Sequence, residues 1–296
     1  MSLTADYSRP AVAPTPVAAE ASTRRRTLLL GIVAAELVML FAPTVRFLID
    51  RWTVSVWHNA HGMFVPPLVA WLAWQELKTR TTLPVQGSAW GFVFLVPALI
   101  LHALDAGIHT ELLSAVSLLV AVPGLALLFL GVERTKAIAF PLCFSVFALP
   151  IPLGLTETIH LVLRHVTVAA TTAVLPWLGI TVFTEGTTLH IVNGTLQVAD
   201  ACSGFSTLYA SLAVATLTAY TARSTARRVL VLAAAAPIAI ASNILRIVFL
   251  VVLVYIWGQE ILETFLHPLS GMMTFALSLP LIFWLGGPAG DRGDGK

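Results

Sequence analysis

Charge and cysteine are both scarce in this sequence. Only 11% of the 296 residues are charged, whereas 57% are hydrophobic, and the mean hydropathy is +0.87. This composition excludes a water-soluble globular protein and indicates an integral membrane protein. Because 17 basic and 15 acidic residues leave a net charge of +2, the total charge favours neither nucleic acid nor an acidic partner. The two cysteines, Cys143 and Cys202, exclude a disulfide scaffold and a multi-cysteine metal site.

Long apolar runs follow a polar N-terminal segment. Residues 1–23 are rich in Ala, Pro, Ser and Thr without apolar periodicity, so we expect a disordered cytoplasmic tail. Runs of spanning or near-spanning length cover residues 27–49, 63–77, 89–104, 112–131, 137–155, 203–222, 229–257 and 268–285. The sequence therefore predicts an all-α polytopic fold, with an eight-span membrane domain over residues 24–286 and a cytoplasmic tail over residues 287–296.

Lysine and arginine predict the orientation of the spans, because cytoplasmic loops are enriched in both. In the eight-span arrangement all basic residues fall on the side of the two termini, except Arg46, Arg51, Arg164 and Arg246. We therefore expect a multi-pass protein of the cytoplasmic (inner) membrane with both termini in the cytoplasm. The segments that carry Cys202 and His267 then face the extracytoplasmic side.

One segment does not fit a simple span. Residues 156–184 must begin and end outside in this arrangement, although much of the segment is apolar. Its polar residues at helical spacing are Glu157, His160, Arg164 and His165. We expect an amphipathic helix at the membrane interface, followed by a re-entrant or surface-lying stretch.

Residues 187–199 predict a short extracytoplasmic β-hairpin, because Asn193-Gly194 is the pair best suited to a type I′ turn. With these two residues as the loop, the four apolar residues share one face in two opposed pairs, Ile191 with Leu196 and Leu189 with Val198.

Cys202 lies where this hairpin meets the next apolar run. If Cys202 or Ser203 is the N-cap of a helix, the sulfur lies beside unsatisfied backbone N–H groups and the positive end of the helix dipole, which favours the thiolate. The alternative is a small apolar packing residue. Asp200, two residues earlier, could be a cap or a base. Cys143 lies inside an apolar run and is interpreted as structural.

Arg246 is the most costly residue of the sequence to place in a membrane. Counting about 20 residues from Val229, it falls within roughly one turn of the outer boundary. Its guanidinium could reach the lipid phosphates, or it could have an anionic partner inside the bundle. Asn243, three residues earlier on the same helix face, offers a donor and an acceptor and favours a polar site.

His267 begins the last apolar run on the outer side. Alone it would be an interface histidine, but beside a thiol and a cation it is a candidate general base and acid. All eight histidines fall outside or at the outer interface in this arrangement, yet no His-x-x-x-His or Cys-x-x-Cys spacing supports a metal site. We expect neither a metal nor another cofactor.

These segments together resemble the exosortase/archaeosortase family of multi-span membrane cysteine transpeptidases. The segment 198–204, Val-Ala-Asp-Ala-Cys-Ser-Gly, resembles the nucleophile segment of the family, and 243–246, Asn-Ile-Leu-Arg, resembles its arginine segment. His267 falls where exosortases carry a histidine, which favours the exosortase branch, and His61-Gly62 resembles an early His-Gly element. The resemblance covers residues 57–271.

The resemblance implies a protease or transpeptidase that cleaves C-terminal sorting signals of secreted proteins through a Cys202 thioester. Such a signal has a short motif such as Pro-Glu-Pro, a transmembrane helix and a basic tail. His267 would assist deprotonation of the thiol and Arg246 would stabilise negative charge. Ser203, Asn243 and Asp200 would support them, and His61 is a possible substrate-binding residue. The lipid bilayer is expected around the chain, and no nucleic acid.

Three other functions remain compatible with the residues themselves. A transporter or channel would use Arg246 and Glu36 along a substrate path. A non-catalytic protein of envelope or polysaccharide assembly would need no thiol chemistry. A serine intramembrane protease would use Ser203 or Ser206 as its nucleophile. The transporter or channel predicts that Cys202→Ala leaves function intact, whereas loss of processing in Arg246→Ala and His267→Ala proteins at normal membrane abundance would argue against the non-catalytic protein.

Overall fold

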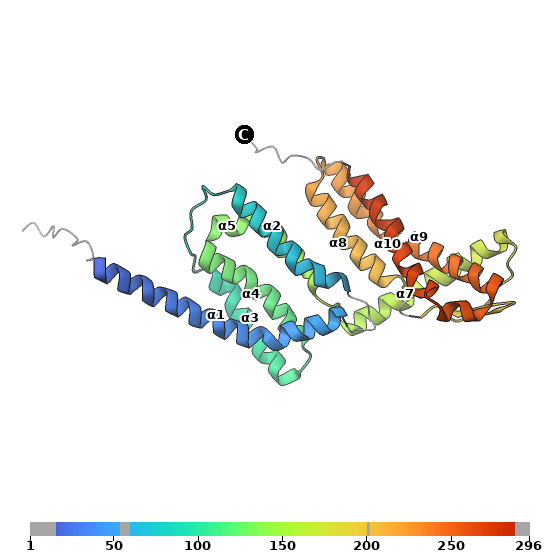
Figure 1. Cartoon of the computed structure of the whole chain (residues 1–296), viewed down its shortest axis with the longest axis horizontal. Coiled ribbons are helices and arrows are strands. Elements are labelled where there is room, and N and C mark those ends of the chain that lie inside the picture. The colour runs from blue at the N-terminus through green and yellow to red at the C-terminus, as the bar shows by residue number, and fades with distance from the viewer. Residues whose placement is uncertain (1–15, 54–59, 200–201, 288–296) are drawn as a thin grey trace, which may run out of the picture. The chain divides into compact units, whose positions relative to one another are not determined.

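A computed structural model describes residues 16–53, 60–199 and 202–287 (Figure 1). The chain divides into two units after Arg46. The first unit holds most of helix α1, Pro16–Thr53. The described part of the expected tail, residues 16–23, is helical, because this Ala-rich stretch has high helix propensity and extends an existing helix. Residues 1–15 and 288–296, where tails were expected, lie outside the described residues.

The second unit, from Phe47 onward, holds the remaining helices and a small sheet. In chain order the helical elements are η1 Ala60–Phe64, α2 Val65–Thr79, α3 Gly91–Ile108, α4 Leu112–Leu130, α5 Val132–Ala137, α6 Ala139–Phe144, η2 Ser145–Ala148, α7 Leu153–Val174, η3 Leu175–Leu178, α8 Phe205–Thr221, α9 Thr225–Trp257, η5 Gln259–Glu263 and α10 Leu266–Gly286. The predominantly helical fold predicted for a polytopic membrane protein is confirmed.

The described residues contain six helical segments long and apolar enough to cross a membrane. They are Gly31–Thr53, Gly91–Ile108, Leu112–Leu130, Gly154–Leu178, Thr225–Trp257 and Leu269–Gly286. The predicted total of eight spans is not confirmed. Helices α2 and α8 have 15 and 17 residues, below the roughly 20 residues that a simple span requires. The run 137–155 does not form one helix: it contains α6 and η2, and Pro150 and Pro152 separate η2 from the start of α7.

The segment Gly154–Leu178 differs from the expected interfacial helix and surface stretch. It forms the continuous helix α7 followed by η3, and its length and composition would suffice for a span. The helix continues because neither proline nor glycine interrupts residues 155–175.

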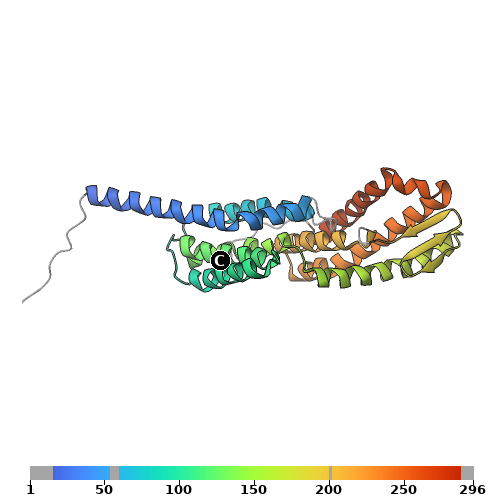
Figure 2. The ribbon, with the colours of Figure 1, turned by 90° about the horizontal axis from the view of Figure 1, so that it is seen from below.

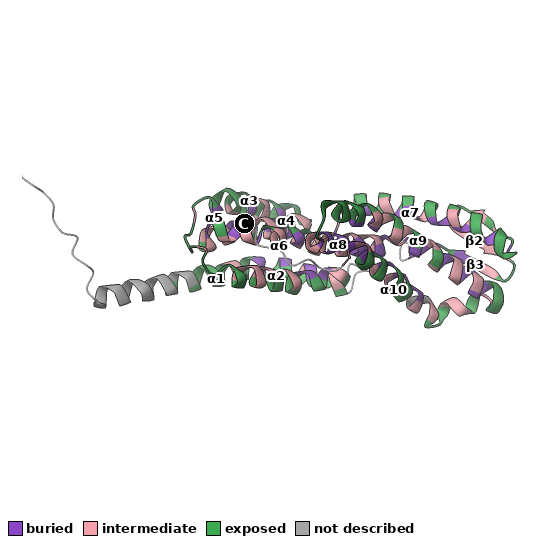
Figure 3. Cartoon of the chain, turned by 90° about the horizontal axis from the view of Figure 1, so that it is seen from above, coloured by how far each residue is buried: buried purple, intermediate pink, exposed green. Residues whose placement is uncertain are grey.

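Helices α8, α9 and α10 pack against one another. The buried side chains between them include Ala215, Val231, Ala235 and Ile282. Small residues such as Ala215 and Ala235 let helix axes approach closely in a membrane. Figure 3 shows buried residues along the length of both α8 and α9.

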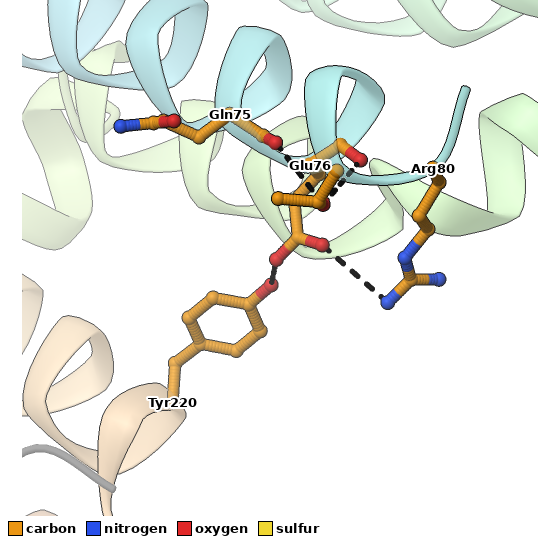
Figure 4. Close-up of polar contacts among 5 residues, drawn as sticks. Gln75, Glu76, Arg80 and Tyr220 are labelled. Atoms are coloured by element: carbon orange, nitrogen blue, oxygen red, sulfur yellow. Dashed lines mark hydrogen bonds and ion pairs between the residues drawn. The ribbon is translucent and has the colours of Figure 1, made fainter. Parts of the chain in front are cut away.

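A polar contact joins α2 to α8 (Figure 4). The Tyr220 hydroxyl donates a hydrogen bond of 2.6 Å to Glu76 Oε1, and Arg80 Nη2 lies 3.4 Å from Glu76 Oε2. The Tyr220 ring stacks on Phe140 of α6, with 3.5 Å between ring centroids. Three helices therefore meet at one tyrosine.

The sheet has three antiparallel strands in the order β1-β2-β3: Phe183–Glu185, Thr188–Ile191 and Gly194–Gln197. It packs against α7 and the C-terminal half of α9, as Figure 2 shows. The predicted hairpin register is wrong by two residues, because Leu189 pairs with Leu196 and Ile191 with Gly194. The turn thus uses Val192 and Asn193, while the predicted apolar face is retained.

Candidate active site

Cys202 lies in the short connection before α8. Its N–H donates to the Ala199 carbonyl at 2.9 Å, and its side chain is only 2% exposed. The N-cap of α8 is Gly204, not Cys202 or Ser203 as expected. The Ser203 hydroxyl still accepts a hydrogen bond from the Phe205 N–H at 3.2 Å, so it partly fulfils the capping role.

Asn243 of α9 holds the backbone of the cysteine. Its Nδ2 donates to the Cys202 carbonyl oxygen at 3.1 Å and to Thr167 Oγ1 of α7 at 3.3 Å. Since Asn243 is 1% exposed, both bonds are shielded from water. The structure therefore brings Asn243 and Cys202 together.

Arg246 reaches the same cysteine from the next turn of α9. Its Nη2 lies 3.9 Å from Cys202 Sγ, and its Nε donates to the Ser270 hydroxyl of α10 at 3.0 Å. The bond to Ser270 holds the guanidinium at Nε, while Nη2 faces the sulfur. Arg246 and Cys202, which are 44 residues apart in the sequence, therefore lie side by side, and Ser270 of α10 holds the arginine in place.

Two opposing effects act on the thiol. Burial raises the pKa of Cys202 above its usual range, and the Arg246 guanidinium offsets only part of that rise. The expectation that the start of α8 would favour the thiolate is therefore corrected: desolvation dominates in this arrangement. The second thiol, Cys143, which was interpreted as structural, is exposed in the structure.

Sequence reasoning did not assign His160 to the site. Its Nδ1 lies 2.7 Å from Ser203 Oγ, and its ring centroid lies 4.7 Å from that of Phe205. The spacing of His160 and Thr167 places both on one face of α7, but nothing in the local sequence connects that face with Ser203.

Two of the predicted site residues are not described in full. Asp200 lies outside the described residues, and so does the side chain of His267, whose backbone belongs to the first turn of α10. Their predicted roles stay predictions.

His61 of η1 lies against a different part of α8. Its ring meets the Tyr209 ring edge-on, with 4.8 Å between centroids. Burial lowers the pKa of His61 to about 4. Tyr209 follows Phe205 by one turn of α8, and Phe205 in turn contacts His160, so His61 belongs to an aromatic cluster beside the site. Among the described residues, no three His, Cys, Asp or Glu side chains are grouped to hold a metal ion.

Fold and site together define a polytopic membrane protein with a buried cysteine next to an arginine. Residues 52–284 match the family model of the transmembrane exosortases. The chain belongs to this family of membrane cysteine proteases and transpeptidases, as the short motifs predicted. Comparisons with curated proteins and with solved structures gave no match.

Proposed function

We propose that the protein cleaves C-terminal sorting signals of secreted proteins, with Cys202 as nucleophile. The observation that carries this proposal is the 3.9 Å approach of Arg246 Nη2 to Cys202 Sγ in a buried setting. A guanidinium there favours the thiolate and the anionic oxygen that forms when a thiolate attacks a carbonyl. A thiol serving only as packing does not require a charged partner.

The reaction begins with proton transfer from Cys202 Sγ to His267, a role that rests on the family resemblance. The thiolate attacks the carbonyl carbon of the scissile peptide, and Arg246 stabilises the resulting oxyanion. When the C–N bond breaks, His267 returns its proton to the leaving amine, and a thioester remains on Cys202. Water or an acceptor amine then attacks the thioester and releases the thiol.

Helix α9 relates this site to the bilayer. Its 33 residues extend for about 50 Å, longer than the hydrocarbon core of about 30 Å. Arg227 and Arg228 lie in its first turn, and Arg246 lies about 30 Å along the helix from Thr225. With the arginine-rich end in the cytoplasm, Cys202 lies at the extracytoplasmic boundary. A substrate with one transmembrane helix and a basic cytoplasmic tail presents its motif at that depth.

The test is co-expression with a secreted reporter that ends in a Pro-Glu-Pro motif, an apolar helix and a basic tail. We expect a shortened reporter and a hydroxylamine-sensitive adduct on the protein, mapped to Cys202 by mass spectrometry. Cys202→Ala should abolish both, whereas Cys143→Ala should abolish neither. Normal processing by a membrane-inserted Cys202→Ala protein would falsify the proposal.

A further inference from the structure

Helix α7 supports the turn that carries Cys202 through two polar contacts. His160 Nδ1 lies 2.7 Å from the Ser203 hydroxyl, directly after Cys202. Two turns later, Thr167 Oγ1 accepts a hydrogen bond from Asn243, which binds the Cys202 carbonyl. One face of α7 therefore supports the residue that follows the sulfur and the amide that holds its backbone.

The Ser203 hydroxyl links His160 to the turn that carries the sulfur. Its Oγ contacts His160 while it accepts the N–H of Phe205, the first residue of α8. Ser203 and His160 are 1% and 2% exposed, so water does not replace either partner readily. A buried hydroxyl held at two points restricts its own backbone and that of the neighbouring Cys202.

The orientation of the Cys202 side chain matters because its contact with Arg246 is long. At 3.9 Å, a rotation of the Cys202 side chain away from the guanidinium would weaken the interaction that opposes the effect of burial on the thiol. The turn that aims Sγ therefore affects how strongly the guanidinium acts on the thiol.

We propose that His160 is a positioning residue, which acts through Ser203 to hold the Cys202 side chain against Arg246. Its importance for catalysis rests on the proposed function, but its effect on the thiol does not require a substrate.

The experiment follows alkylation of Cys202 by iodoacetamide against pH, in purified full-length protein carrying Cys143→Ala, so that one thiol reacts. We expect His160→Ala to lower the rate near neutral pH by about tenfold and to move the midpoint of the profile to a pH about 1 higher. His160→Asn should retain most of the reactivity, because its amide can occupy the position of Nδ1. The longer His160→Gln should not.

The matched control is His165→Ala on the same helix. His165 is exposed and its Nδ1 contacts the Leu161 carbonyl, so this variant should react like the parent. A decisive comparison repeats His160→Ala in an Arg246→Ala background. There we expect no further change in the profile, because the guanidinium that the turn serves is gone.

Three results would overturn the proposal: coincident profiles for His160→Ala and the parent, equal profiles for the Asn and Gln variants, or an undiminished effect of His160→Ala in the Arg246→Ala background. If His160→Ala does not accumulate, the Asn and Gln variants and Ser203→Ala decide, since Ser203→Ala should also move the profile to higher pH. The thioester assay is separate. An altered profile without any substrate adduct would remove the proposed function and leave the positioning role intact.

Discussion

Gly204 and Asn243 are in such close contact that a Cβ atom at position 204 would lie 2.6 Å from the Asn243 Cγ atom. Gly204 also has a φ of +84°, where a residue with a side chain is strained by about 1–2 kcal/mol. The same asparagine binds the Cys202 carbonyl. The glycine of the Cys-Ser-Gly segment is therefore required by the packing that fixes the Cys202 backbone.

Gly204→Ala should displace Asn243 and lower the reactivity of Cys202 while the protein still inserts. A methyl group at this position forces the amide to move, which weakens its bond to the Cys202 carbonyl. The measurement is the alkylation rate of Cys202 in a Cys143→Ala protein, compared with Gly154→Ala, where an added Cβ meets no atom within 4 Å. Equal rates in the two variants would contradict the expected role of Gly204.

Asn243→Ala should destabilise the protein by about 1–3 kcal/mol, because it leaves the buried Cys202 carbonyl without this donor. Asn243→Asp should lower the reactivity of the Cys202 thiol more than Asn243→Ala does. A carboxylate cannot donate a hydrogen bond, and its charge disfavours the neighbouring thiolate. The apparent melting temperature measures the first effect and the pH profile of alkylation the second. A lower pH midpoint in Asn243→Asp would contradict the assigned geometry.

Arg246→Gln should raise the pKa of Cys202 further, because the guanidinium is the group that lowers it. At a fixed neutral pH the ionised fraction of the thiol, and hence the alkylation rate, should fall about tenfold each time the pKa rises by 1. Arg246→Lys should restore part of the rate, since the charge remains but the fixed geometry at Ser270 is lost. Arg134→Gln, which removes a bond to the Leu83 carbonyl, is the control and should not move the profile.

The local motifs indicated three residues that the structure brings together, but not the residues around them. Cys202, Asn243 and Arg246 could be identified because each lies in a short segment with its own chemical signal. His160 could not, because its partner Ser203 is 43 residues away and only tertiary packing brings them together. The helical spacing of His160 with other polar residues of α7 indicated a helix between water and lipid, although the His160 side chain is buried in the protein.

The same distinction applies to the fold. The lengths of the apolar runs predicted the helical regions. They did not predict that α8 would have only 17 residues, or that the run 137–155 would contain α6 and η2 instead of forming one helix. In the hairpin, alternation placed Leu189 and Leu196 on one face, because the side-chain period of a strand is two. A displacement of the turn by one residue preserves that alternation, so the pattern could not determine the register.

Burial of His61 predicts a loss of stability in mild acid. Its pKa in the folded protein is about 4, below the ordinary value of 6.5, so between these values the unfolded chain takes up a proton that the folded protein does not. Stability should therefore fall as the pH decreases through this window, by at most about 1.4 kcal/mol for a pH decrease of 1. His61→Gln should reduce the decrease in apparent melting temperature, and the exposed His165→Gln should not. Identical decreases in all three proteins would exclude this origin.

Tyr220→Phe isolates the contribution of one hydroxyl to the packing of α2 against α8. The change removes the 2.6 Å bond to Glu76 but retains the ring that stacks on Phe140. Because the acceptor is a carboxylate in a partly buried site, we expect the free energy of unfolding to fall by about 1.5–3 kcal/mol.

Glu76→Gln should destabilise the protein less, since its amide oxygen still accepts from Tyr220, although the charge opposite Arg80 is lost. Thermal unfolding of the purified protein measures both changes, and a Tyr220→Phe protein as stable as the parent would show that the hydroxyl contributes nothing to this contact. Since Tyr220 lies near the end of α8 remote from Cys202, the alkylation rate of the cysteine should stay the same in both variants.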